Sequence, residues 1–517
     1  MNLAEKAWAQ TTSETTTAHC GSGKPFWNAE ARQFMYVPSF QFQPVPGCEK
    51  YIYEATDETG NEHSFSSSSP CALLTPIWKD IPEGVVSLRV YSTDKNGEKL
   101  YLIGARTFFR LAPFTGNYLP ADCSYRECAL RAFEYCFNSP IIRHWLEHGT
   151  PYPEYDLYVY PSKMEASIIV SMLKYGELCP ERNKDCLKIA CSAADYLISI
   201  TEPDGSPLEG VPPTYYTDFR EFGGNMNNLT ADERKDTVMM FYPASAGLAY
   251  LALEKKTNNP KYLDTALKIG EYYRKNVLEN GSWYLIVSRL TGKPAAANYC
   301  MPTNEILPFL RGLFDRTGDE CWKVLSDNAL AYVENNALKT YNWEGQFEDS
   351  VLSFNYSNLA HGDCDKLIMY YTSNFPDSKE KIDTAEELMR FVEDQFVVWN
   401  RPCPWDKNDF DITCWPTPCC LEQYNWYVPV DASTAVIAKT FLSLGKVTGD
   451  ELYFAKAKAL MNTVTRVQNK KSGRIPTEWK EPGFIDNAAA DLEFWINCLL
   501  YSASVLTEFA DYFGDEQ

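Results

Sequence analysis

A helical unit recurs along much of this chain and restricts its fold more than any other feature. Three clear copies run Ala246–Asn276, Asn304–Asn336 and Ala432–Gln468. Each has an apolar helix, a short break such as Thr-Asn-Asn-Pro or Thr-Gly-Asp, and an amphipathic helix with apolar residues at a spacing of 3–4. The break supplies an Asn or Asp that can cap the second helix. Weaker copies cover Ala166–Ser199 and Asp365–Phe396.

A sixth pair can form from the last helix, Asp491–Phe513, and the first one, about Tyr125–Glu147. The aligned breaks fall at 179, 257, 317, 375 and 448, and repetition at this period indicates stacked supersecondary units. We therefore predict a mainly α fold in which residues 120–513 form an (α/α)6 toroid of six helical hairpins. An open α-solenoid is the alternative, although its repeats usually span only about 34–47 residues.

Residues 25–115 have a different pattern. Short β-prone runs at 50–54, 85–91 and 100–106 alternate with turn residues such as Asp94-Lys95-Asn96-Gly97. This spacing predicts a small antiparallel β-sandwich in front of the toroid. The run from Pro44 to Glu98 resembles a fibronectin type III or related immunoglobulin-like module, which implies a spacer or docking role. We expect residues 1–24 to be a flexible N-terminal segment.

Composition excludes several classes of function. With 69 acidic and 48 basic side chains among 517 residues, the chain has a formal charge of −21, which argues against nucleic acid as a partner. No stretch approaches the roughly 20 apolar residues of a membrane span. The N-terminus lacks the apolar run of a secretory signal, so we expect a cytoplasmic protein, or a periplasmic or secreted one if a signal was removed.

The cysteines and histidines give no sign of a metal site. The 17 cysteines contain no CxxC pair, and the five histidines provide no Cys/His zinc spacing. We therefore expect mostly reduced, buried thiols, no metal and no cofactor. The sequence leaves the oligomeric state open.

The long loops between the hairpins are rich in aromatic, acidic and glycine residues, whereas the breaks inside the hairpins are short. Aromatic residues make up 14% of the chain. Loops on a rigid scaffold often carry binding and catalysis. Rings can stack on sugars, and paired carboxylates can act on a glycosidic bond, so we expect an oligosaccharide or polysaccharide as the partner. In the competing interpretation, the rings pin the loops to the barrel and the acids cap helices.

Three acids are the catalytic candidates. Asp349 comes first, because Glu348-Asp349 follows Trp343 in a loop that no repeat requires, and flanking rings can raise the pKa of an acid. Asp236 and Asp431, each just ahead of an apolar helix, complete the set. The substrate-binding candidates are Tyr215, Asp218, Arg220, Trp343, Glu348, His361, Asp363, Arg401, Trp405, Glu422, Tyr424, Trp426 and Trp479.

Residues of about 120–513 resemble the (α/α)6-toroid carbohydrate-active enzymes, a group that includes glycoside hydrolases, polysaccharide lyases and sugar epimerases. Within that group, Lys235–Tyr273 is similar to the first catalytic helix of unsaturated glucuronyl hydrolases, which implies an essential acid at Asp236. Those enzymes carry a second Asp before the next inner helix. This chain has Asn298 and Asn304 there, so the resemblance extends only to the class.

The favoured hypothesis is a glycoside hydrolase that acts on an oligosaccharide with two carboxylates drawn from Asp349, Asp236 and Asp431. A lyase or uronate epimerase is an alternative. It would use His361 or a Tyr as base and Arg220 or Arg401 to bind a sugar carboxylate. A non-catalytic glycan-binding protein is the third possibility.

Overall fold

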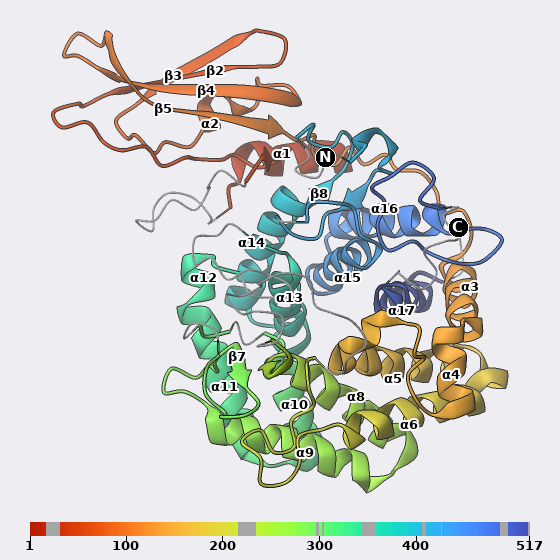
Figure 1. The fold of residues 1–517 in the computed structure, drawn as a ribbon. Helices are drawn as coiled ribbons and strands as arrows, with labels where there is room; N and C mark the ends of the chain where they lie inside the picture. Colours follow the sequence, from red (N-terminus) through yellow and green to blue (C-terminus); the bar gives the residue numbers. More distant parts are fainter. Residues whose placement is uncertain are drawn as a thin grey trace.

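The computed structural model describes residues 1–16, 31–215, 234–295, 299–301, 304–343, 358–405, 410–424, 426–485 and 495–514. Helical pairs dominate it (Figure 1). Five pairs follow one another along the described chain: α5 (Pro161–Leu178) with α6 (Asn183–Ser199), α8 (Tyr242–Thr257) with α9 (Pro260–Asn276), α10 (Ile306–Thr317) with α11 (Glu320–Asn335), α13 (Gly362–Asn374) with α14 (Lys379–Phe396), and α15 (Asp431–Thr448) with α16 (Glu451–Val467). In addition, α17 (Ile496–Phe513) packs against α3 (Tyr125–Asn138). The predicted mainly α class is confirmed.

The breaks within the pairs lie where the sequence predicts them. Asn259 caps α9 by accepting a hydrogen bond from the backbone N–H of Lys261. Asp319 and Asp450 cap α11 and α16 in the same way. Each cap satisfies a backbone donor that the first turn of the helix leaves without a partner. The Asn or Asp of the break is therefore what starts each of these second helices.

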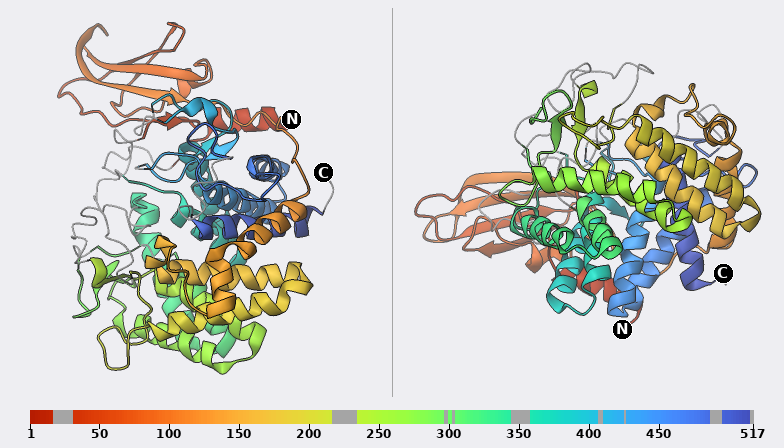
Figure 2. Two further views of the ribbon diagram at one scale, coloured as in Figure 1. Left: turned by 45° about the vertical axis from the view of Figure 1, so that its right-hand side comes forward. Right: turned by 90° about the horizontal axis from the view of Figure 1, so that it is seen from below.

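The pairs are arranged in two layers, with one helix of each pair inside and the other outside (Figures 1 and 2). On the inside, α5 packs on α8 and α8 on α10, while α13 packs on α15, α15 on α17 and α17 on α5. Between α10 and α13, the side-chain amide of Asn304 donates a hydrogen bond to the carbonyl oxygen of Asp363 at 2.9 Å. The inner helices are thus enclosed by neighbours, and the hydrophobic core fills the space between the layers.

Short elements complete the helical body. The small strand pairs are β6 (Thr237–Met239) with β7 (Ile286–Ser288) and β8 (Val397–Val398) with β9 (Cys419–Cys420), both antiparallel. The short helices are α4 (Pro140–His148), α12 (Ala337–Thr340), η1 (Asp156–Val159), η2 (Pro180–Arg182) and η3 (Ile412–Cys414).

One five-stranded sheet stands where the sequence predicts a β-sandwich. Its order is β1-β5-β4-β2-β3, formed by β1 (Gln33–Phe34), β5 (Lys99–Arg110), β4 (Gly84–Thr93), β2 (Tyr51–Thr56) and β3 (Glu62–Ser67). β1 runs parallel to β5, and the other neighbours are antiparallel. Within the described part of residues 25–115 no second sheet faces it. Its buried face packs instead on α2 (Thr75–Trp78) and on a cluster of rings that includes Trp78 and Phe108, at 6.0 Å between centroids.

The N-terminal segment, which the sequence predicts to be flexible, contains a helix, α1 (Leu3–Ser13). Asn2 and Glu5 form a capping box, in which each side chain accepts a hydrogen bond from the other residue's backbone N–H. Lys6 pairs with Asp450 at the start of α16 at 2.6 Å. The prediction missed this helix because it rests on a cap and a few tertiary contacts, and not on a strong apolar pattern.

A buried carboxylate at the end of α14 fixes the sheet to the helical body. The Glu393 side chain accepts a hydrogen bond from the Tyr36 hydroxyl at 2.9 Å and one from Trp399 Nε1 at 2.9 Å. Lys456 of α16 pairs with Glu393 at 2.7 Å, and both side chains are almost fully buried. One group therefore joins the sheet segment, the end of α14 and α16.

The next two residues of α14 extend this junction. Asp394 accepts hydrogen bonds from the backbone N–H groups of Met35 and Tyr36, at 2.5 and 2.7 Å. Burial raises the pKa of Asp394 to about 7, against the opposing effect of these hydrogen bonds. Gln395 and Gln33 each donate from the side-chain amide to the other's backbone carbonyl. In all views the sheet lies against one side of the helices (Figure 2).

Two observations concern the described residues as a whole. None of their helices has both the length and the apolar composition needed to cross a membrane. All of the cysteines among them are free, and half of these are buried while the others are partly exposed.

Removing the cation of the junction should destabilise the protein. In Lys456→Ala, Glu393 stays buried without its charge partner, so we expect a loss of about 3–5 kcal/mol in the free energy of unfolding, measured by urea titration. Lys379→Ala is the control, because it breaks an ion pair with Asp383 whose side chains are 85% and 55% exposed. Equal effects of the two substitutions would contradict a structural role for the Glu393–Lys456 pair.

Candidate active site

Acidic side chains stand at the start of several inner helices, at the end of the ring where the segments between the hairpins enter. Glu305 directly precedes α10, Asp363 lies in the first turn of α13, and Asp431 is the first residue of α15. The positive end of the helix dipole favours an acid at such a position. The three acids have different surroundings, however, and these set what each can do.

Glu305 and Asp363 belong to neighbouring inner helices. Glu305 accepts a hydrogen bond from the Ser245 hydroxyl at 2.5 Å and pairs with Lys366 Nζ at 2.6 Å. Its side chain is still 18% exposed, so a ligand can reach it. Asp363 is 5% exposed. Burial raises the pKa of Asp363 to about 7, with Lys366 lowering it and Glu305 raising it further. One carboxyl group is thus held by a cation, while its neighbour retains a proton near neutral pH.

His361 and Asp365 form a second arrangement, on α13. His361 Nδ1 lies 2.6 Å from Asp365 Oδ2, and both residues are buried. Within the described residues, His361 Nε2 and Asp365 Oδ1 have no hydrogen-bond partner. A carboxylate on one ring nitrogen orients the imidazole and leaves the other nitrogen for proton transfer. The pair therefore has the geometry of an oriented base.

Asp431 is completely buried, and the Ser502 hydroxyl of α17 donates a hydrogen bond to it at 2.9 Å. Burial raises the pKa of Asp431 to about 8, although the Ser502 hydrogen bond lowers it. Its other oxygen, Oδ1, has no partner among the described residues. Asp431 is therefore a proton donor at neutral pH, packed between α15 and α17.

Rings and charges gather near the starts of α5, α15 and α17. Trp426 Nε1 donates a hydrogen bond to Glu478 at 2.5 Å, and Lys480 lies 4.3 Å from the Trp426 ring. Lys163 of α5 lies 4.1 Å from the Trp495 ring. These groups lie around the Cys498 thiol. Burial raises the pKa of Cys498, and the thiol also interacts with the charges of Asp431, Lys163, Glu422 and Glu478.

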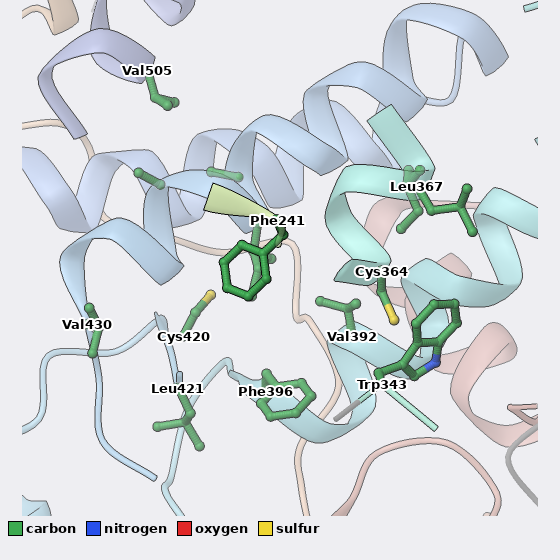
Figure 3. Close-up of a cluster of buried hydrophobic side chains, with 14 of the residues drawn as sticks. Phe241, Trp343, Cys364, Leu367, Val392, Phe396, Cys420, Leu421, Val430 and Val505 are labelled. Atoms are coloured by element: carbon green, nitrogen blue, oxygen red, sulfur yellow. The ribbon is translucent and has the colours of Figure 1, made fainter. Parts of the chain in front are cut away.

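Several of the predicted binding rings pack the core. Trp343 and Trp479 are fully buried, and Figure 3 draws Trp343 with Cys364, Leu367 and Val392 in one apolar cluster. The Tyr424 hydroxyl donates to Gln395 Oε1 at 2.5 Å, and Tyr215 is 2% exposed. These four rings pin loops to the helices, as the competing interpretation of the sequence holds. Trp426 and Glu422, by contrast, are partly exposed in the group around Cys498.

Three further candidates lie elsewhere. Arg401, proposed to bind a sugar carboxylate, pairs instead with Glu58 of the sheet through two hydrogen bonds of 2.9 and 3.1 Å. Trp405 is 37% exposed, and its carbonyl accepts a hydrogen bond from Arg32. Asp236 is exposed and precedes the short strand β6, so it does not stand directly at an inner helix.

The remaining candidates, Asp349, Glu348, Asp218 and Arg220, lie outside the described residues. Among the described residues there is no group of three or more His, Cys, Asp or Glu side chains that could hold a metal ion.

Sequence reasoning missed Glu305 and its partner Lys366. A signal for Glu305 was present: aligning the repeats places it, like Asp363 and Asp431, at the start of the first helix of a hairpin. The resemblance to glucuronyl hydrolases implies an Asp at this point, whereas the chain has Asn304 followed by Glu305. Lys366 gave no signal, because a single Lys on a helix is most often exposed.

No protein-family model matches the sequence, and no curated protein matches it. Among solved structures, the chain is similar to a family 76 glycoside hydrolase from a bovine Bacteroides thetaiotaomicron strain (10% identity, TM-score 0.46, 92% of this chain and 96% of that one). It is also similar to cellobiose 2-epimerase from Spirochaeta thermophila (11% identity, TM-score 0.47, 74% and 98%). A third is an unsaturated glucuronyl hydrolase specific for heparin (13% identity, TM-score 0.34, 82% and 91%). These values assign no substrate and no catalytic residue to this chain.

The buried acid Asp431 should make stability depend on pH. Its pKa is about 8 in the folded protein against a usual 3.8, so the folded state holds a proton that the unfolded chain releases. Stability from this group is complete below about pH 4 and is lost as the pH rises to about 8. Asp431→Asn removes this titration, so thermal unfolding should show a smaller loss of stability between about pH 5 and about pH 8 than in the wild type.

The exposed Asp204, which pairs with Lys268, provides the control for Asp431, and Asp204→Asn should leave the pH dependence unchanged. A pH dependence in Asp431→Asn as steep as that of the wild type would contradict a buried, protonated Asp431.

Proposed function

We propose that this chain is a carbohydrate-processing enzyme, a glycoside hydrolase built on a closed (α/α)6 toroid, which cleaves an oligosaccharide where α10 and α13 begin. The observation that carries the proposal is the contrast between two neighbouring carboxyl groups. Asp363 has its pKa raised to about 7, and Glu305 is held by Lys366 at 2.6 Å. Two carboxyl groups in such different surroundings can divide the roles of acid and base.

In this mechanism the protonated form of Asp363, which a pKa of about 7 keeps substantially populated at neutral pH, donates its proton to the oxygen of the leaving sugar. Glu305 acts as the carboxylate, either attacking the anomeric carbon or activating a water molecule. Ser245 and Lys366 hold Glu305 in place, from α8 and α13. A separation of about 5–5.5 Å between the two carboxyl groups would give retention of configuration, and about 6.5–9.5 Å would give inversion.

The partly exposed group around Trp426, Glu478 and Lys163 is the proposed binding surface for further sugar units. Its rings offer stacking surface, and its carboxylates can accept hydrogen bonds from sugar hydroxyls. Asp349, Glu348, Asp218 and Arg220 stay predictions for the same role. Their segments lead into α13 and α8.

A lyase or epimerase is the second candidate, and the His361–Asp365 pair favours it. An oriented imidazole with a free Nε2 is suited to removing a proton from the carbon next to a sugar carboxylate. A non-catalytic glycan-binding protein would need neither the carboxyl pair nor an oriented imidazole.

The roles of Asp363 and Glu305 can be tested by substitution. Asp363→Asn and Glu305→Gln should each lower kcat by about 10²–10⁴-fold, since each removes one proton-transfer group. Turnover of an oligosaccharide panel is followed as new reducing ends. In the wild type, activity should fall as the pH rises above about 7, because Asp363 then loses the proton that it must donate. Glu334→Gln, which alters a carboxylate between α11 and α14, is the control. Wild-type rates in both variants would overturn the assignment.

Substitution of His361 separates the two candidate functions. If the protein is a hydrolase, His361→Ala should retain turnover within about tenfold, because His361 is then only a neighbour of the acid–base pair. If it is a lyase or epimerase, His361→Ala should abolish turnover, and a lyase would form an unsaturated product that absorbs in the near ultraviolet. Formation of such a product by the wild type, together with total loss of turnover in a His361→Ala variant that circular dichroism shows to be folded, would replace the hydrolase proposal by the lyase.

A further inference from the structure

A large groove lies on the outer side of the helical body, between α3, the start of α4, the end of α5 and the turn at residues 469–474. Its volume is about 830 Å³, within the range of about 300–1,000 Å³ typical of small-ligand sites. Arg131, Glu134, Tyr135, Tyr175, Lys470 and Lys471 contribute to its wall. None of the residues proposed for catalysis lines it, so it is separate from the candidate active site.

The groove is cationic although the chain has a formal charge of −21. Arg131, Lys470 and Lys471 line it, against the single carboxylate of Glu134. Arg182 already neutralises Glu134, at 2.7 Å. The Lys471 ammonium forms no ion pair within the described residues. A site of this charge on an acidic protein attracts an anionic group, and binding to it should weaken with salt.

The acids that pair with Arg131 and Lys470 do not line the groove. Arg131 pairs with Glu127, and Lys470 pairs with Asp122 at 3.1 Å. Glu127 and Asp122 line a smaller neighbouring cavity of about 200 Å³ instead. Arg131 and Lys470 line both spaces and are engaged by these two acids, so Lys471 is the lining cation that no acid of the described residues neutralises.

The turn that carries the lysines is held rigidly. Asn469 Oδ1 accepts hydrogen bonds from the backbone N–H groups of Lys471 and Ser472, at 2.9 and 3.0 Å. Gly473 has a φ of +83°, and a Cβ atom there would lie 2.4 Å from the Arg131 carbonyl oxygen. Only glycine fits so close to α3 in this conformation. The lysines are thus presented by a fixed turn, and not by a loose loop.

The opposite wall provides rings in fixed positions. Tyr175 stacks on Phe133 at 5.1 Å between centroids, and its hydroxyl donates a hydrogen bond to Glu134. Tyr135 and the amide-bearing Asn138 lie on the same wall. Tyr175 is 1% exposed and only supports the wall, whereas Tyr135 is partly exposed. The Tyr135 ring can pack on the apolar face of a sugar, the Asn138 amide can bind a hydroxyl, and the cations can bind an acidic group on that sugar.

We infer that this groove is a second binding site, for a short oligosaccharide that carries a carboxylate or sulfate group. The sugar part of this inference rests on the proposed function, whereas the preference for an anion rests on the groove alone. Binding there would hold an acidic glycan chain on the outer wall while the inner-helix end acts on another part of it.

Isothermal titration of the full chain tests the inference, with Glu305→Gln as the background so that no probe is consumed. The probes are trigalacturonic acid for the carboxylate, a sulfated trisaccharide for the sulfate, and neutral maltotriose. We expect at least one acidic probe to bind and maltotriose to bind at least about tenfold more weakly. Lys471→Glu and Lys470→Glu should each weaken the acidic probe by about tenfold or more, and Lys379→Glu, the same charge change on α14, should not.

The inference is overturned if neither acidic probe binds, if maltotriose binds equally well, or if Lys470→Glu and Lys471→Glu bind like the wild type. Equal binding of citrate would overturn the sugar part. The outcome is independent of the proposed function. If the protein turns over no oligosaccharide but binds an acidic trisaccharide through the two lysines, the inference about the groove stands and the hydrolase proposal fails. If it turns over an oligosaccharide but shows no such binding, the hydrolase proposal stands and the inference about the groove fails.

Discussion

The enclosure of the inner helices is the constraint on which the rest of this structure depends. Most inner helices pack between neighbouring inner helices and the outer layer, so a charge along their length has limited access to water and is favoured by a partner nearby. Glu508 of α17 is an example: although 34% exposed, it pairs with both Lys174 of α5 and Lys439 of α15, at 2.9 and 3.1 Å. At the starts of the helices the constraint is weaker, because backbone N–H groups and the helix dipole favour an acid there. The scaffold thus restricts reactive carboxyl groups to one end of the ring.

Acids at equivalent repeat positions have become chemically different through their neighbours. Glu305 contacts a Lys and a Ser, Asp363 is mainly affected by burial, and Asp431 is buried and accepts a hydrogen bond from one hydroxyl. A repeat supplies the same position several times, and each copy can then be adjusted independently by the packing around it. In the proposed mechanism, these different surroundings are what would let two carboxyl groups act as acid and base.

The sequence predicted the features that local chemistry decides. The breaks of the hairpins could be located because Asn259, Asp319 and Asp450 are caps, and a cap is read from a few adjacent residues. The burial of Trp343, Trp479 and Tyr424 could not be predicted, since a ring in a long loop looks the same in a core as at a binding surface. Arg401 belongs to the same class: its partner, Glu58, is more than 300 positions away in the sequence. The sequence also did not predict that there is a single sheet. Alternation of apolar and polar residues along a strand shows that one face of the sheet is buried, but it does not show what covers that face.

The junction at the end of α14 has a consequence for how such a protein could evolve. Gln395 joins the sheet segment at Gln33, and it also accepts the hydroxyl of Tyr424 in the segment that leads toward α15. A domain boundary near residue 115 would therefore divide a continuous interior. It would leave Glu393, Asp394 and Gln395 without their partners. The sheet is therefore not an independent module that recombination could exchange or delete. It and the helical body can only be inherited together, and substitutions on either side of the junction must be compensated on the other.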